Sequence, residues 1–149
     1  MDVGEICTRE VVIATRDTTV LEAARLMREY HVGDVVVVDE SSGRSIPVGI
    51  VTDRDIVVGV VATGLDPAAL TVGDIMGGEP ATAAEHDDVY ETLQIMRARG
   101  VRRVPVVDAE GALAGILALD DVLEVLAEEL DAAVKVVARE QANEAQRRR

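Results

Sequence analysis

The sequence predicts a mixed α/β (α+β) fold in which two β-α-β-β-α repeats pack together as a pseudo-twofold pair. Residues 3–39 match residues 72–108 at a shift of 69, and the match resumes beyond Pro47 at a shift of 66. Short valine runs alternate with stretches whose apolar residues follow helical spacing. One such repeat cannot cover both faces of its own small sheet, so the two copies should pack against each other.

The duplication keeps its register across many residue types. Val3-Gly4-Glu5-Ile6 matches Val72-Gly73-Asp74-Ile75, and Val37-Val38-Asp39 matches Val106-Val107-Asp108. The shift changes because the first copy has three extra residues in the turn around 41–47. We therefore divide the chain into a first repeat, a second repeat and a C-terminal helical extension or tail. These segments cover residues 3–66, 67–130 and 131–149.

Each copy predicts the same elements in the same order. In the first copy, Thr19 and Glu22 have the spacing of a capping box, which marks the start of a helix. Val35–Val38 is a continuous apolar run, as expected for a strand buried on both faces. The predicted strands of the first copy are 11–15, 35–38 and 48–52, and its second helix is 53–62. The predicted elements of the second copy are strands 80–84, 104–107 and 113–117 and helices 89–99 and 120 onward.

The last predicted helix is longer than the sheet needs. Its apolar stripe runs through Val122, Leu123, Leu126, Leu130, Val134 and Val137. Acidic residues come early and arginines come last, which suits the helix dipole. Two interpretations stay open at this point: the helix extends a subunit interface, or it is a fraying tail.

The composition excludes several classes of protein. With no Trp or Phe, the core has to be aliphatic. A net charge of −13 and a single basic run at the C-terminus argue against a nucleic-acid partner. A single cysteine, Cys7, allows no internal disulfide and suits a reducing compartment. No signal peptide or apolar run of about 18 residues is evident, so we expect a soluble cytoplasmic protein without a membrane partner.

The segment Gly49–Asp55 has the residues of a ligand-binding junction. A small residue, a β-branched strand, the hydroxyl of Thr52 and the carboxylate of Asp55 stand where a strand meets a helix. Free backbone N–H groups at such a junction suit phosphate, and a carboxylate can accept both hydroxyls of a ribose. The alternative is an ordinary N-cap, with Thr52 or Asp53 capping the helix. Taken alone, the segment is compatible with both interpretations.

The order and duplication of these marks resemble the cystathionine β-synthase (CBS) domain family. The resemblance covers about residues 3–130 and rests on Met27, Met96, Val37-Val38-Asp39, Pro105-Val106-Val107-Asp108 and Gly49–Asp55. Residues 52–67 also resemble the small stand-alone two-repeat members of the hypoxic-response type. The resemblance implies a tandem pair, often called a Bateman module, that binds an adenosine-type ligand.

The resemblance also implies roles for individual residues. Asp55 would hold the ribose and Thr52 the phosphate. Ile50 and Val32 would line the adenine slot, together with the facing segment Pro80-Ala81-Thr82 of the other copy. Arg102 and Arg103 would meet phosphates in the central cleft, the alternative being a solvated pair at a strand edge. The second copy keeps Asp121 but has Ala118 where the first has a hydroxyl, so we expect one good site and one weak or empty site.

We therefore expect a non-catalytic regulatory module that binds AMP or ADP, with ATP or S-adenosylmethionine as alternatives. ATP would need more cationic compensation, from Mg²⁺ or from Arg102 and Arg103. The module should be a homodimer that signals to a separate protein, which the sequence does not identify. The alternative function is a ligand-free dimeric scaffold.

An enzyme is disfavoured, because no nucleophile, base or metal set stands at a usable spacing. His31, His86 and Cys7 do not form a metal-ligand pattern. Cys7 aligns with Met76, which suggests a buried apolar role for the thiol.

Overall fold

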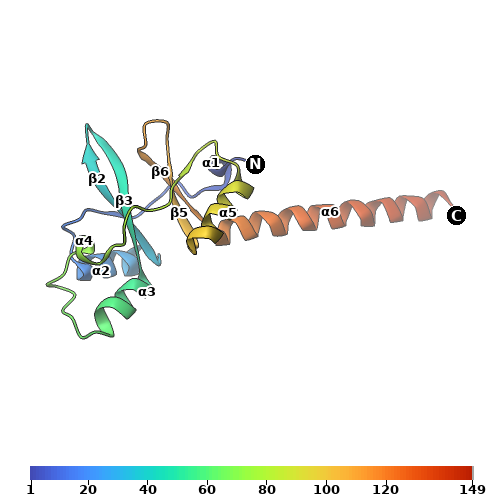
Figure 1. The fold of residues 1–149 in the computed structure, drawn as a ribbon. Helices are drawn as coiled ribbons and strands as arrows, with labels where there is room; N and C mark the ends of the chain where they lie inside the picture. Colours follow the sequence, from blue (N-terminus) through green and yellow to red (C-terminus); the bar gives the residue numbers. More distant parts are fainter. Residues whose placement is uncertain (149) are drawn as a thin grey trace.

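The structure, a computed structural model, describes residues 1–148 and shows a two-part body from which one long helix projects (Figure 1). The elements of the first repeat are α1 (Val3–Ile6), β1 (Ile13–Ala14), α2 (Val20–Tyr30), β2 (Asp34–Ser41), β3 (Arg44–Thr52), α3 (Asp53–Ile56) and the π-helical turn η1 (Val57–Val61). Those of the second are α4 (Val72–Ile75), β4 (Ala83–Ala84), α5 (Val89–Arg99), β5 (Arg103–Val107), β6 (Leu113–Ala118) and α6 (Leu119–Arg147).

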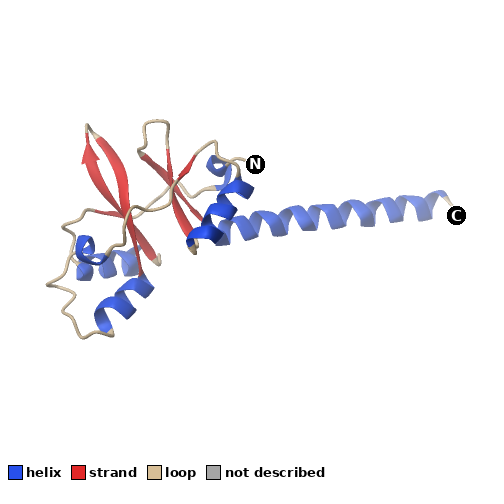
Figure 2. Cartoon of the chain, viewed as in Figure 1, coloured by secondary structure: helices blue, strands red, loops and turns tan. Residues whose placement is uncertain are grey.

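Two three-stranded sheets have the same topology, which confirms the predicted fold class and its duplication. In the first sheet β1 pairs parallel with β2, and β2 pairs antiparallel with β3. In the second sheet β4, β5 and β6 repeat this arrangement. The two sheets approach each other through β3 and β6, with helices on their outer sides (Figure 2).

Valine-rich strands form the centres of two separate cores. Val35, Val36, Val37 and Val38 of β2 are all no more than 1% exposed, as their continuous apolar run predicts. The first core joins residues of β2 and β3 to residues of α2 and η1. The second core joins residues of β5 and β6 to residues of α5 and to Val122 of α6. Helix α2 and η1, and helix α5 with the start of α6, therefore bury apolar side chains against the sheet of their own repeat.

The two repeats exchange their opening segments. Val3 of α1 is fully buried in the second core, whereas Val72 of α4 is fully buried in the first core. The backbones of Thr8 and Ile116 exchange two hydrogen bonds of 2.9 Å, so the segment after α1 is tied to β6. Figure 1 accordingly shows the N-terminus beside α5 rather than near α2. The exchange interlocks the halves, because neither core is complete without a segment from the other repeat.

Several predicted boundaries are wrong. The strands expected at 11–15 and 80–84 shrink to two residues each, and Pro80 lacks the N–H that a ladder requires. The hairpin of β2 and β3 runs further than expected, to a turn at Ser42 and Gly43 with positive φ values of 52° and 77°. The expected helix 53–62 is one α-helical turn followed by a π-helical turn.

The predicted C-terminal helix is present and continuous to Arg147. Arg149, the last residue of the predicted basic run, lies outside the described residues. Within residues 1–148, no helix combines the length and the apolar character needed to cross a membrane.

Candidate functional site

The junction between β3 and α3 is built as a reciprocal capping box. The N–H of Thr52 donates to Asp55 Oδ2 at 2.9 Å, and the N–H of Asp55 donates to Thr52 Oγ1 at 3.1 Å. Thr52 and Asp55 therefore do cap the start of α3, as the N-cap interpretation predicts. It leaves room for a ligand, because a carboxylate and a hydroxyl both accept more than one hydrogen bond. The side chain of Asp55 is exposed and that of Thr52 is half-buried.

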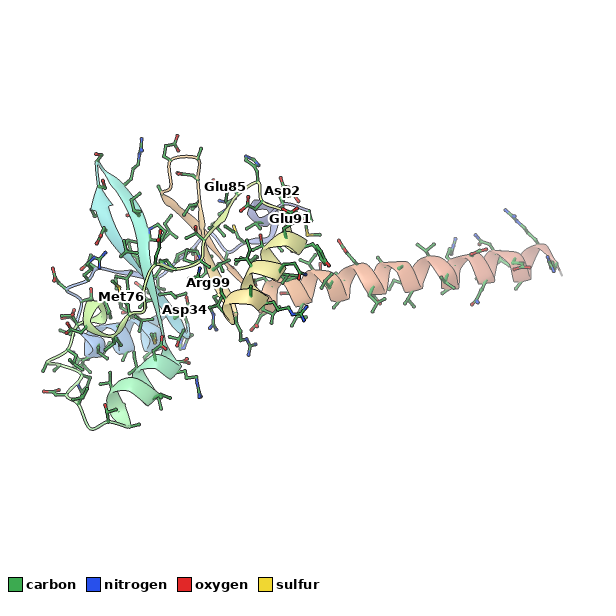
Figure 3. All side chains as sticks on the ribbon, viewed as in Figure 1. Asp2, Asp34, Met76, Glu85, Glu91 and Arg99 are labelled. Atoms are coloured by element: carbon green, nitrogen blue, oxygen red, sulfur yellow. The ribbon has the colours of Figure 1, made fainter. Side chains whose placement is uncertain are left out.

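An ion pair joins the two repeats at their centre. Arg103 Nε lies 3.1 Å from Asp34 Oδ1, and the side chain of Asp34 is only 13% exposed. These residues open β5 and β2 and occupy matched positions at the shift of 69, so the pair spans the pseudo-twofold axis. Figure 3 shows Asp34 between the two halves of the molecule. Burial raises the pKa of Asp34 most strongly, Arg103 lowers that pKa, and Asp53 raises it further.

Backbone hydrogen bonds fix both strand-to-helix junctions in the same way. The N–H of Asp53 donates to the carbonyl of Gly33 at 2.9 Å, and the N–H of Leu119 donates to the carbonyl of Arg102 at 2.8 Å. Each helix start is thus held against the loop that precedes the middle strand of its own sheet. The two junctions are therefore anchored alike in both repeats.

At the end of the cleft near Asp121, a cavity of about 380 Å³ draws residues from both repeats. The first repeat supplies residues 10–12 and 31–34, while the second supplies Ile116, Ala118, Asp120, Asp121 and Arg103. Four carboxylates, those of Glu10, Asp34, Asp120 and Asp121, line this cavity together with the one arginine. Because Arg103 is already paired with Asp34, this end offers little attraction for a phosphate.

The structure divides the residues that the sequence predicted for the site. Val32 and Arg103 line the cavity with Asp121, whereas Ile50, Thr52 and Asp55 belong to the junction of the first repeat. Asp55 also lines a smaller hollow of about 260 Å³ with Arg54, Val58, Gly59 and Ile75. Pro80 and Ala81 lie in the segment before β4, where Ala81 packs against the second core.

The pseudo-twofold relation identifies residues that the sequence-based prediction missed. Val32 lies beside Asp121, and Val101 is its match in the second repeat. The pseudo-twofold relation therefore predicts Val101 beside the Thr52 junction. Asp34 and Glu10 were also missed, although the alignment of the repeats already matched Asp34 with Arg103. The alignment of the two repeats could have predicted these residues, because each end of the cleft combines a junction of one repeat with a loop of the other.

The two predicted phosphate-binding arginines occupy different environments. Arg103 is two-thirds buried, in the ion pair with Asp34. Arg102 is 70% exposed, and its Nη2 lies 3.2 Å from Asp120 Oδ1. Arg103 is therefore the cation held inside the cleft, whereas Arg102 is a largely solvated side chain at its rim.

The glycine of each junction strand admits the opening segment of the other repeat. A Cβ on Gly49 would lie 2.7 Å from Met76 Sδ, and one on Gly115 would lie 2.9 Å from Cys7 Sγ. Figure 3 shows Met76 beside β3. Burial raises the pKa of the Cys7 thiol, which favours the neutral, packed form over a reactive thiolate. In the described part of the chain, no three His, Cys, Asp or Glu side chains gather as a metal site would require.

Comparison with known proteins identifies the family. A family model of the CBS domain matches residues 3–61 and again residues 72–128. The chain belongs to the CBS-domain family. An uncharacterized protein of Methanopyrus kandleri is 38% identical over 125 residues, which are 84% of this chain and 62% of that relative. This CBS-domain chain thus spans less than two thirds of that relative's length. Hypoxic response protein 1 of Mycobacterium tuberculosis is 32% identical over 128 residues, which are 86% of this chain and 82% of that protein.

Solved structures of other CBS-domain proteins share the fold. A CBS domain protein of Pyrobaculum aerophilum complexed with AMP superposes with a TM-score of 0.73 at 29% identity, covering 81% of this chain and 89% of that one. The CBS domain pair of protein MJ0100, in complex with 5′-methylthioadenosine and S-adenosyl-L-methionine, gives a TM-score of 0.73 at 25% identity. That match covers 85% of this chain and 99% of the other. Relatives with this fold therefore bind adenosine compounds.

Proposed function

We propose that this CBS pair is a non-catalytic regulatory module that binds AMP or ADP at the Thr52–Asp55 junction and signals to a separate protein. The observation that carries the proposal is the junction itself, which combines the Thr52 hydroxyl with the exposed Asp55 carboxylate and pairs Thr52 in strand register with Asp34 of the ion pair. The adenosine ligands of the two solved relatives support it. The carboxylate of Asp55 would accept the ribose hydroxyls, and Thr52 would bind a phosphate oxygen.

The charges at matched positions favour the Thr52 junction over the Asp121 end. Arg54 at the Thr52 junction stands where the Asp121 end has Asp120. A ligand with one or two phosphates would therefore meet a less negative field at the Thr52 junction. ATP would need an accompanying Mg²⁺ here, because the chain as a whole carries a net charge of −13.

Arg103 provides a physical route from ligand to signal. A phosphate near the centre of the cleft would compete with Asp34 for the Arg103 guanidinium, since both are anionic partners. The loss of that pair would loosen the contact between the repeats and leave the buried Asp34 carboxylate without its cation. A ligand changes a conformational equilibrium only through such a difference in affinity between two states. The partner in a homodimer, or a separate regulated protein, would read the change.

Thermal unfolding with added ligand tests the proposal. Wild-type protein is measured with AMP, ADP, ATP with and without Mg²⁺, and S-adenosylmethionine, each at about 1 mM. A ligand at 100 times its Kd stabilises the folded state by about 2.7 kcal/mol. For a chain of this size, that corresponds to a rise in Tm of roughly 5–10 °C.

Asp55→Ala and Asp74→Ala form a matched pair for this test. Asp74 makes the same capping box with Thr71, at 2.9 Å and 3.3 Å, at the start of α4. Both variants should lose similar stability without ligand, but only Asp55→Ala should lose the ligand-dependent rise in Tm. If no ligand raises the Tm of the wild type, the ligand-free scaffold becomes the better account. If both variants respond as the wild type does, the ligand binds without Asp55 and the proposed site is wrong.

A further inference from the structure

Helix α6 carries an apolar stripe that no other element within residues 1–148 covers. Within this helix of 29 residues only Val122 is buried, and the helix leaves the body soon afterwards (Figure 1). Leu126, Leu130, Val134 and Val137 are 51%, 68%, 58% and 54% exposed. Their spacing of three and four residues places them on one face. The match to the CBS domain ends at residue 128, so most of this stripe belongs to the extension beyond it.

A helix with one apolar face needs a partner for that face. In water, isolated helices are marginally stable, and most helical stability in proteins comes from packing an amphipathic face. The part of α6 beyond residue 128 extends over about 28 Å at 1.5 Å per residue. Its stripe alternates leucine and valine with charged residues on the opposite face, which is the pattern of a helix that packs against another helix.

The charges along α6 indicate which helix covers the stripe. Residues 119–131 contain six carboxylates and no basic side chain, namely Asp120, Asp121, Glu124, Glu128, Glu129 and Asp131. Residues 132–148 contain four basic side chains and two carboxylates. A second α6 in the same direction would set acidic half against acidic half. The opposite direction sets each acidic half beside a stretch that contains Lys135 and Arg139, which reduces this repulsion.

We propose that α6 is a dimerisation arm that pairs antiparallel with α6 of a second copy, crossing near Leu130. Residues equally far from Leu130 on either side then face each other. Leu123 lies opposite Val137 of the partner helix and Leu126 lies opposite its Val134. This register places the whole exposed stripe of each helix against the stripe of the other.

An apolar groove continues this surface onto the body. The groove, of about 520 Å³, lies where α6 passes α1 and α5, and Ile6, Tyr90, Leu93 and Leu126 are among the residues that line it. Asp88 and Glu129 add negative charge to the same groove. In the antiparallel register, Val134, Lys135 and Ala138 of the partner helix lie opposite Leu126, Val125 and Val122, so the partner helix runs beside this groove. Lys135 then complements the negative charge of Asp88 and Glu129.

Self-association of the full chain, measured by analytical ultracentrifugation, tests the arm. Val134→Glu alters the stripe, whereas Val136→Glu alters a valine outside it that is at least as exposed, at 68% against 58%. Val134→Glu should raise the dimer Kd more than about tenfold, because each dimer would bury two carboxylates. Val136→Glu should change it less than about twofold, with the same helical content by circular dichroism. Equal Kd values for both variants, or a wild type that stays monomeric at about 0.1 mM, would overturn the proposal.

Disulfide trapping in a Cys7→Ala background tests the orientation. Leu130→Cys should cross-link with itself under oxidising conditions. Leu123→Cys should cross-link with Val137→Cys when the two variants are mixed, but not with itself. Self-linkage of Leu123→Cys without the mixed product would show a parallel pair and refute the antiparallel one. Val134→Glu lies far from the cleft, so the Tm of this variant with added nucleotide tests the proposed ligand site independently of the arm.

Discussion

Replacing Gly115 by alanine should disrupt the exchange of opening segments more than the equivalent change in the first repeat. The added Cβ would lie 2.8 Å from the carbonyl oxygen of Thr8 and 2.9 Å from Cys7 Sγ. Ordinary contacts begin at 3.4 Å, so the segment after α1 would have to retreat by about 0.6 Å to escape this overpacking. The retreat moves backbone atoms, because the closest neighbour is a main-chain oxygen.

The size of the effect follows from what the retreat strains. Overpacking of a tight interior costs about 1–3 kcal/mol. Thr8 and Ile116 also exchange two backbone hydrogen bonds of 2.9 Å, and weakening one of them costs about 0.5–1.5 kcal/mol. Gly115→Ala should therefore lower the free energy of unfolding by about 2–4 kcal/mol. In a chain of this length, such a loss lowers the Tm by roughly 5–15 °C.

Gly49→Ala is the matched control. Its Cβ would lie 2.7 Å from Met76 Sδ, but a methionine side chain has three rotatable bonds and can move aside. We expect a loss of about 1 kcal/mol or less, because the contact strains a flexible side chain rather than the backbone. Differential scanning calorimetry of wild type and both variants measures the difference. Equal losses in the two variants, or a larger loss for Gly49→Ala, would show that the glycines do not act through this close approach.

Four further substitutions probe the caps, the ion pair and the core. Thr52→Ala and Thr71→Ala should each cost about 1 kcal/mol in thermal unfolding without ligand, because each removes an N-cap; unequal losses would contradict the equivalence of the two boxes. Because the pKa of Asp34 is raised above its ordinary value of 3.8 in the folded state, the folded chain binds this proton more tightly. Wild type should therefore lose stability relative to Asp34→Asn as the pH rises from about 4 through the folded pKa, as measured by urea unfolding; a difference independent of pH would refute this. Leu117→Ala, at a fully buried site, should cost about 2–5 kcal/mol in the same assay, and a loss below about 1 kcal/mol would contradict its place in the second core.

The sequence was sufficient for the repeat and for most elements within it. Val35–Val38 reads as a buried strand because all four side chains are apolar, and the structure buries all four. The capping box of Thr19 and Glu22 places the start of α2 correctly, because both partners are local in the chain. Local signals of this kind carry the prediction wherever an element is defined by residues a few positions apart.

Relations between distant segments were harder to predict. Nothing in the residues around Val3 shows that α1 completes the second core, since the same pattern recurs at Val72. For the same reason, the family resemblance predicts Val32 at the Thr52 junction of its own repeat, whereas the structure places Val32 beside Asp121. Internal duplication makes each segment equally compatible with either core. Only the three-dimensional pairing distinguishes them.

The exchange also explains how two repeats with the same topology can give unequal ends of one cleft. A pseudo-twofold axis makes matched positions neighbours at the centre, so a single difference there acts on both ends. Asp34 and Arg103 occupy such positions, and their ion pair uses the cation that either end would need for a phosphate. At the strand-to-helix junctions, the first repeat has the hydroxyl of Thr52. The second repeat has Ala118 at the matching position, without a hydroxyl, and Asp120 adds a carboxylate there. Duplication supplies the two-ended geometry, and a few substitutions then favour anionic ligands at one end over the other.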